Sequence, residues 1–373
     1  MSRYIYENGI RIVKPYYLTY KTNVKLRWIG KTLIDILTIE FNESKKAIIN
    51  DITTEKLYIE NKKSITKGEL LINCKIESHD VINHLNHKHE APIPDKEIEI
   101  VYQDDDLIVV NKPSGIPTHP TGNYKYNTVS EMVKEKIGLD NIWVVHRLDK
   151  VTSGVLILAK NKTAGSKFSK ILKEQRDECK KVYLARVKGR FLDDEIIFQA
   201  PVILVNMNGY IPGDEIQTNS KTIFKKVKYD EVEDESIVEC TPITGKNHQI
   251  RMHLKVLGYP ITNDFFYNPT DKNTVEKCKI EEKLYKNYFG KYGNELPDVI
   301  SVSDIKDDTI EHDLSKLKES KANSIVNKRT EFCYECQRNI FPNVLEDYQI
   351  YLHALEFHYK DYHFKTDLPD WYN

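Results

Sequence analysis

Residues 144–161, VVHRLDKVTSGVLILAKN, decide the fold, because two apolar, strand-like runs flank a charged turn. The first run leads into Asp149, and the second, Val155 to Ala159, carries the chain away after a glycine-containing turn. The carboxylate is therefore expected at a rigid corner. Arg147 and Lys150 flank it, and opposite charge favours the ionised form. An ionised, positioned carboxylate can act as a nucleophile. The alternative is a structural Arg–Asp pair that closes the turn.

Length and composition limit the possibilities. The 373 residues allow one large domain and a smaller one. The net charge of −1 means that any basic nucleic-acid-binding surface is local. The chain has no apolar window of about 18 residues, and its start, MSRYIYENGI, lacks a signal-peptide core. We therefore expect a soluble, cytoplasmic monomer, with nuclear or mitochondrial placement left open, and six reduced cysteines.

The residues around the turn read as alternating strands and helices. Residues 97–111 predict a hairpin that turns at Asp104 to Asp106, and Thr128 to Glu131 form a capping box for a helix to about Ile137. We also expect helices at 162–178 and 248–257, and strands at 180–187, 236–242 and 347–359. Residues 268–346 are polar and lack apolar periodicity, which favours a long surface insertion with partial disorder.

Four strings in this order resemble the motifs of the RluA family of pseudouridine synthases, and a closing LHA string at 352–354 is similar too. They are DDDLIVVNKPSGIPTHP (104–120), VVHRLDKVTSGVLILAKN (144–161), KKVYLARVKG (180–189) and TGKNHQIRMHLKVLGYPI (244–261). The sequence departs from the family at Lys246 and Asn247, near the start of the string at 244–261, and at Asn263, just after it. The resemblance implies an α+β catalytic domain with a large, mostly antiparallel mixed sheet.

The resemblance also implies a reaction and its residues. It implies that the chain isomerises uridine to pseudouridine in RNA without a cofactor, with Asp149 as catalytic aspartate and Tyr183 against the target base. A tyrosine ring can stack on a flipped uracil, and its hydroxyl can pass a proton. Arg251 is implied to pair with Asp149. On spacing alone, Tyr183 could be a sheet-packing residue and Arg251 a surface arginine.

The eukaryotic branch of the family that acts on tRNA is the most similar, which suggests tRNA and position 32. Synthases that act on rRNA or mRNA stay open. A non-catalytic RNA-binding protein is a different class of function, but intact Asp149, Tyr183 and Arg251 argue against it. An unrelated nucleoside-processing hydrolase would need a water-activating base or metal site, and none is evident. By resemblance Arg147 would fill the space that the flipped base vacates, and the other expected RNA contacts are His146, Lys112, Lys150, Lys62 and Lys63.

The N-terminal part is expected to consist of two pieces before the catalytic domain at 91–373. Residues 1–29 mix basic and aromatic side chains, which suits RNA contact or packing on a neighbour equally. Residues 30–90 predict two helices, at 32–39 and near 46–51, and then two short strands. This order looks like a diverged S4-type RNA-binding module, whose lysines are diluted by acidic residues.

Two groups of residues imitate metal sites. Four histidines cluster before Ala91, at positions 79, 84, 87 and 89: His79, His84, His87 and His89. No cysteine or aspartate arrangement nearby in sequence completes a tetrahedral site with them. The string HKHEAPIP (87–94) resembles the linker that enters the catalytic domain in the same family branch. Cys333-x-x-Cys336 with His353 and His358 imitates a zinc-finger spacing. His353 lies within the LHA string and should point from a sheet strand. We therefore expect a linker at 87–94 and no metal at either group.

Overall fold

The computed structural model describes residues 2–41, 43–175, 178–191, 194–293, 297–324, 331–336, 338–342 and 349–373. The chain forms two compact units. Unit 1 consists of residues 1–7, 12–92 and 328–343, and unit 2 consists of residues 8–11, 93–327 and 344–373. The boundary at 92–93 lies close to the expected start of the catalytic domain at 91. The C-terminal contribution to unit 1, however, is not evident from sequence order.

Unit 1 contains a four-stranded sheet in the order β3-β6-β4-β5 and two helices. Helix α1 buries Leu33, Ile36 and Leu37, whereas Ile39 is exposed. Strand β2 (Ile10–Val13) has two residues in each unit. The elements that begin in unit 1 are β1 (Tyr4–Glu7), β3 (Tyr16–Asn23), η1 (Leu26–Trp28), α1 (Leu33–Phe41), α2 (Lys45–Thr53), β4 (Leu57–Glu60), β5 (Ile65–Thr66), η2 (Gly68–Leu71), β6 (Val81–Lys88), β18 (Glu331–Cys333) and β19 (Arg338–Ile340).

Most of residues 1–29 belong to the same unit as residues 30–90, so the expected division at 29–30 does not fit. Strand β3 pairs with β6 along its whole length, and Trp28 is buried with the apolar side chains of α1 and α2. The basic and aromatic residues of this segment therefore include a core tryptophan as well as exposed side chains. Of the two roles considered for this segment, RNA contact or packing on a neighbour, the structure shows packing for Trp28.

The expected linker at 87–94 overlaps a strand at its first two residues. Residues 81–88 form β6, which pairs with both β3 and β4. His84 is buried there, and its Nε2 lies 2.9 Å from Oδ2 of Asp51 on α2. A strand in the middle of a sheet has its backbone groups bonded on both sides, so this segment is part of the unit 1 core.

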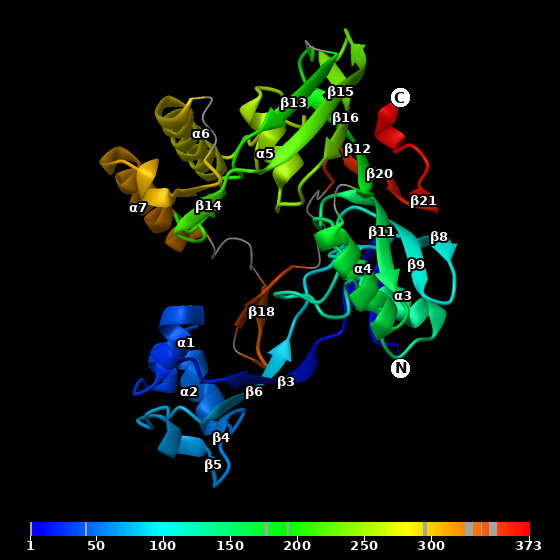
Figure 1. Ribbon diagram of the computed structural model, residues 1–373. Helices are drawn as coiled ribbons and strands as arrows, with labels where there is room; N and C mark the ends of the chain where they lie inside the picture. The colour runs from blue at the N-terminus through cyan, green and yellow to red at the C-terminus, as the bar shows by residue number, and fades with distance from the viewer. Residues whose placement is uncertain are drawn as a thin grey trace. The chain divides into compact units, whose positions relative to one another are not determined.

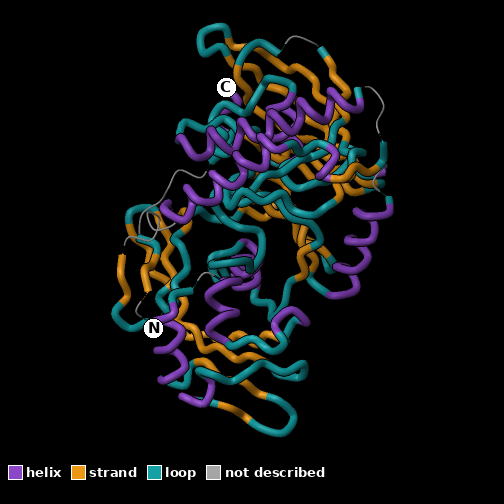
Figure 2. Tube along the Cα trace, turned by 90° about the vertical axis from the view of Figure 1, so that its left-hand side faces the viewer, coloured by secondary structure: helices purple, strands orange, loops and turns teal. Residues whose placement is uncertain are grey.

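Unit 2 is built on a ten-stranded sheet among the described residues, in the order β13-β15-β16-β12-β20-β11-β9-β8, with β10 on β11 and β21 on β20. The strand labels follow this order in Figure 1. Strands β11 and β20 are parallel, and the other pairs are antiparallel. Figure 2 shows both strands (orange) and helices (purple) along the trace. The predicted α+β class with a mostly antiparallel mixed sheet is confirmed.

The predicted elements around the charged turn are present with small shifts in their bounds. Thr128 caps α3 as predicted, since its side chain accepts from the backbone of Glu131. The elements of unit 2 are β7 (Ile93–Pro94), β8 (Glu99–Gln103), β9 (Leu107–Lys112), α3 (Val129–Ile137), β10 (Trp143–Val144), β11 (Ser153–Ala159), α4 (Lys162–Glu174), β12 (Lys180–Lys188), β13 (Glu195–Gln199), β14 (Glu215–Gln217), β15 (Lys221–Asp230), β16 (Glu235–Pro242), α5 (Gln249–Val256), α6 (Lys272–Tyr292), β17 (Val299–Ser301), η4 (Val302–Asp304), α7 (Asp308–Ser324), β20 (Leu352–Tyr359), β21 (Tyr362–Lys365) and η6 (Asp370–Tyr372).

The expectation of partial disorder at 268–346 is wrong for the described part of this segment. Helices α6 and α7 bury Leu284, Tyr288, Ile310 and Leu317 in one apolar cluster. The remainder of the expected insertion, at 294–296, 325–330, 337 and 343–346, lies outside the described residues. Among the described helices, none is long and apolar enough to cross a membrane.

Candidate active site

Asp149 lies in the loop between β10 and β11, as the sequence predicted. Strand β11 then runs parallel to β20, with Gly154 opposite Ala354. Gly154 has a φ of +107°, and a Cβ atom there would overlap the Ala354 carbonyl oxygen. Only glycine allows this close approach. The turn after Asp149 is thus fixed by the pairing of the two central strands.

The Lys112 side chain anchors the loop that carries Asp149. Its side chain is fully buried, and its Nζ donates to the carbonyl oxygens of Pro113 (2.9 Å), Lys150 (3.1 Å) and Thr152 (2.7 Å). Burial lowers the pKa of Lys112 to about 7, partly offset by Asp149. Three carbonyl acceptors favour the protonated ammonium, because each takes one of its three protons. This burial does not fit the expected RNA contact, and Lys112 instead joins the backbone that follows Asp149 to the backbone at Pro113.

We predict that Lys112→Met lowers the free energy of unfolding by about 2 kcal/mol. Three buried or partly buried carbonyls lose their donor, at about 1–3 kcal/mol for each group left unpaired and buried, while removal of a buried charge offsets part of that loss. The rate should fall as well, since the Asp149 loop loses its anchor. Denaturant melts and single-turnover rates would test this, with Lys167→Met at an exposed position of α4 as control. Equal behaviour of the two variants would contradict the anchoring role.

Arg251 forms the ion pair with Asp149 that the sequence predicted. Its Nη1 donates to Asp149 Oδ2 at 3.0 Å. Its Nε and Nη2 donate to the two carboxylate oxygens of Asp264 at 2.6 and 2.8 Å, and the Asp264 side chain is fully buried. Burial works against the charged guanidinium, but Asp264 and then Asp149 raise the pKa of Arg251 above its ordinary value. Two-point binding of this kind fixes the plane of the guanidinium.

Asp264 is in turn held by the backbone, which accounts for its deep burial. It accepts from the backbone N–H groups of Phe266 (3.0 Å) and Tyr267 (3.2 Å). The Asp149 carboxylate, by contrast, keeps 22% of its side-chain surface exposed. Of the two carboxylates bound to Arg251, Asp149 is therefore the one that a substrate can reach.

His248 is a further neighbour of Asp149, and we did not single it out from the sequence. Its Nε2 lies 3.6 Å from Asp149 Oδ2, and its Nδ1 lies 2.8 Å from the Tyr267 hydroxyl. Burial lowers the pKa of His248, although Asp149 works in the opposite direction. Its φ of +57° at the start of α5 is rare for a non-glycine residue. The sequence did offer a signal for His248, because this residue lies inside the motif string at 244–261.

Tyr183 lies on β12, opposite Cys240 of β16 on one side and Ala354 of β20 on the other. Burial, and then the charge of Asp149, raise the pKa of Tyr183 above its ordinary value. The phenol is therefore protonated at neutral pH. It can donate or relay a proton, but it is not available as a phenolate base.

Comparison with known proteins identifies the family. A family model described as RNA pseudouridylate synthase matches residues 106–255. The tRNA pseudouridine(31) synthase of Saccharomyces cerevisiae is 33% identical over 405 residues, which cover 98% of this chain and 96% of that protein. The mitochondrial tRNA pseudouridine(32) synthase of the same yeast is 31% identical over 398 residues, covering 98% and 78%. The dual-specificity RNA pseudouridine synthase RluA of Vibrio parahaemolyticus is 38% identical over 195 residues, covering 51% and 76%.

The chain belongs to the RluA family of RNA pseudouridine synthases. It isomerises uridine to pseudouridine in RNA. The family model spans the Asp149 loop, Tyr183 and Arg251, so the residues that the structure brings together are those of the matched region.

The remaining expected RNA contacts of this synthase differ in their accessibility. Arg147 is exposed beside Asp149, and Lys62 and Lys63 are exposed on the turn between β4 and β5 of unit 1. Lys150 donates to the Tyr124 hydroxyl at 2.6 Å. Burial lowers the pKa of His146 to about 3, and its Nε2 accepts from the backbone of Ile157. A neutral imidazole with that nitrogen in use is poorly suited to bind a phosphate.

The two imitated metal sites do not form as the sequence grouped them. His353 belongs to unit 2, where its Nδ1 lies 2.8 Å from Ser153 Oγ and its Nε2 lies 2.7 Å from Thr366 Oγ1. His358 also belongs to unit 2, on β20. Within the described parts of the chain, two groups of ligand-bearing side chains could hold a metal ion, and neither includes Asp149.

Proposed function

We propose that this synthase acts on tRNA, at the uridine of position 32, with Asp149 as the reacting carboxylate. The observation that carries the proposal is the contrast between the two carboxylates on Arg251. Asp264 is fully enclosed, whereas Asp149 is partly exposed and oriented by the same guanidinium. A carboxylate that is both held and accessible can react with a bound nucleotide.

The reaction breaks the bond between C1′ and N1 of uridine, turns the uracil, and joins C1′ to C5. One proton leaves C5 and one is gained at N1, so atoms balance without a further reactant. Asp149 acts either as the nucleophile at C1′ or as the base that takes a ribose proton. Arg251 keeps that carboxylate in place, because its Nη1 donates to Asp149 Oδ2 at 3.0 Å. Tyr183, as a neutral phenol, offers a stacking face and a hydroxyl that can relay the C5 proton.

The target base must leave its stack before Asp149 can reach the sugar. Extrusion of a base costs a few kcal/mol, which protein contacts in the vacated space can offset. Arg147 is two residues from Asp149 and exposed, so we assign it to that space. Lys62 and Lys63 on the unit 1 turn are assigned to phosphate contacts, as expected of an S4-like RNA-binding module.

Position 32 is proposed because one similar yeast protein is named for it and because the motif strings resemble that branch. Position 31 is the second candidate, since another similar yeast protein is named for that position. The yeast protein named for position 32 is also named as mitochondrial, so mitochondrial tRNA is a substrate to test.

The substrate assignment predicts which uridine is required. With the purified chain and 5-tritiated tRNA transcripts, we expect tritium release from wild-type tRNA and from a transcript in which uridine 31 is replaced by cytidine. A transcript with cytidine at position 32 should release none above background. Release that depends on uridine 31 instead would select the second candidate. Release from rRNA or mRNA fragments but not from tRNA would overturn the tRNA assignment.

A further inference from the structure

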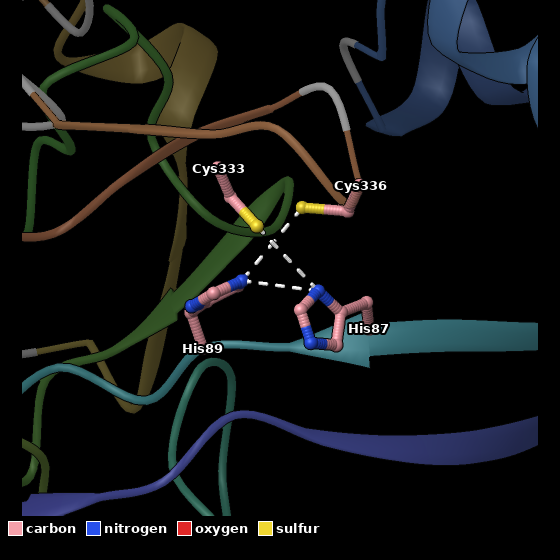
Figure 3. Close-up of side chains that lie close together, drawn as sticks. All are labelled: His87, His89, Cys333 and Cys336. Carbon is pink, nitrogen blue, oxygen red and sulfur yellow. Dashed lines mark hydrogen bonds between the residues drawn. The ribbon is translucent and has the colours of Figure 1, made fainter.

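Two histidines and two cysteines from opposite ends of the sequence meet in unit 1 (Figure 3). His87 is on β6, and His89 follows that strand. Cys333 is the last residue of β18, and Cys336 belongs to the turn that follows it. One ligand atom from each residue lies within 4.8 Å of the others. The sequence positions of the contacting pairs are 246 and 247 residues apart, so each half of the group looks incomplete when it is read alone.

The spacing of the four atoms matches a tetrahedral zinc site. Cys333 Sγ lies 3.7 Å from His87 Nδ1, Cys336 Sγ lies 3.7 Å from His89 Nε2, and the two imidazole nitrogens are 3.3 Å apart. With Zn–S distances of about 2.3 Å and Zn–N distances of about 2.05 Å, a tetrahedron has S···N edges of about 3.6 Å and an N···N edge of about 3.3 Å. These are the separations that a bound zinc ion requires.

The other nitrogen of His87 has a carboxylate partner. His87 Nε2 lies 3.2 Å from Oε2 of Glu335, which stands between the two cysteines in sequence. Tyr17 donates from its hydroxyl to the other carboxylate oxygen of Glu335 at 2.6 Å. Ligating histidines commonly donate their second N–H to a carboxylate, which fixes the ring and raises the basicity of the ligating nitrogen. The arrangement therefore includes support for at least one ligand.

The hairpin that carries the cysteines is held on unit 1 by contacts that involve no ligand. Arg338 donates to Asn86 Oδ1 (3.0 Å), Glu43 Oε2 (2.9 Å) and Asp51 Oδ2 (2.7 Å). These bonds place β19 against β6 and α2 independently of the cysteine and histidine side chains. The four ligands are thus brought together by the packing of the unit as well as by their own contacts.

We propose that His87, His89, Cys333 and Cys336 bind one zinc ion in a structural site. Four protein ligands of the Cys₂His₂ type close the coordination shell, which is typical of structural rather than catalytic zinc. Cys336 is buried, and all six cysteines are free thiols. The ion joins the hairpin at residues 331–340 to the end of β6. This assignment replaces the expectation that neither sequence group binds metal.

The metal content of the full-length chain tests the proposal. After dialysis of the reduced protein with zinc chloride and removal of excess zinc, we expect about one zinc per chain by mass spectrometry. The double variant Cys333→Ser/Cys336→Ser should lose it. The matched control Cys74→Ser/Cys179→Ser removes two half-buried thiols outside the group and should keep it. No zinc in the reduced wild-type protein, or equal zinc in both double variants, would overturn the site.

Cobalt substitution identifies the ligands without relying on a variant that fails to fold. The wild-type chain loaded with Co²⁺ should show the intense visible bands of a tetrahedral ion and a thiolate-to-cobalt charge-transfer band. In His89→Cys the ion should stay bound, and the charge-transfer band should grow as a third thiolate joins. A weak octahedral spectrum, or a charge-transfer band unchanged by His89→Cys, would count against the assigned ligands.

Glu335 provides a graded test of the supporting carboxylate. Glu335→Gln should weaken zinc affinity by about 10- to 100-fold, measured by competition with a chromophoric chelator. Glu331→Gln, at an exposed position of the same hairpin, should leave the affinity unchanged. Equal affinities of the two variants would remove Glu335 from the site.

Discussion

The Asp149→Asn variant should lose pseudouridine formation by about 10⁶-fold, the scale of loss when an enzyme nucleophile is removed. Asparagine has nearly the same volume, and its carbonyl oxygen can still accept the 3.0 Å hydrogen bond from Arg251. It can neither attack as an anion nor take a proton at neutral pH. The chemical step should therefore fail while the fold and RNA binding are nearly unchanged.

The measurement combines tritium release from 5-tritiated tRNA with a thermal melt and a filter-binding curve on the same preparation. Asp140→Asn is the matched control, since Asp140 is exposed and is no neighbour of Arg251 in the described contacts. Activity of Asp149→Asn within tenfold of wild type would contradict the catalytic assignment. A large loss of stability with activity retained per folded molecule would support the structural Arg–Asp alternative.

Arg251→Ala should damage stability and rate together. The variant leaves Asp264, whose side chain is fully buried, without the guanidinium that binds both of its oxygens. Breaking a buried ion pair from one side costs about 3–5 kcal/mol. Asp149 loses the same partner, so the rate per folded molecule at saturating RNA should fall as well.

The two effects can be separated with one further variant. In Arg251→Ala/Asp264→Leu the unpaired buried carboxylate is gone, so stability should recover in part while the rate stays low. Chemical denaturation and single-turnover rates measure the two quantities, and Arg190→Ala at an exposed position serves as control. Full recovery of the rate in the double variant would show that Arg251 acts on Asp264 alone and not on Asp149.

Much of the fold around the site was predictable from local sequence. The hairpin of β8 and β9, the capped helix α3 and the strands that flank Asp149 all lie where the hydrophobic periodicity and the capping residues predicted them. These features depend on neighbours in sequence, such as the bond from Thr128 to the backbone of Glu131. The pairing of Arg251 with Asp149 was also predicted, but from resemblance to the family motifs and not from spacing.

Only the tertiary structure decided which distant groups meet. The helical order of α6 and α7 was missed because their apolar stripes are weak, and burial in a shared cluster determines their stability. The burial of Lys112 and Asp264 was equally invisible, since a charged residue in sequence does not reveal the carbonyls or the arginine that surround it.

The sequence by itself determined the chemistry of the turn at Asp149, because a carboxylate between two strands needs only its immediate neighbours to be positioned. It also contained both halves of the His87, His89, Cys333 and Cys336 group, but it did not join them. Residues separated by 246 positions come together only when the sheet of unit 1 forms and Arg338 binds Asn86, Glu43 and Asp51. Local periodicity carries no information about such contacts, since they depend on long-range packing of the folded chain.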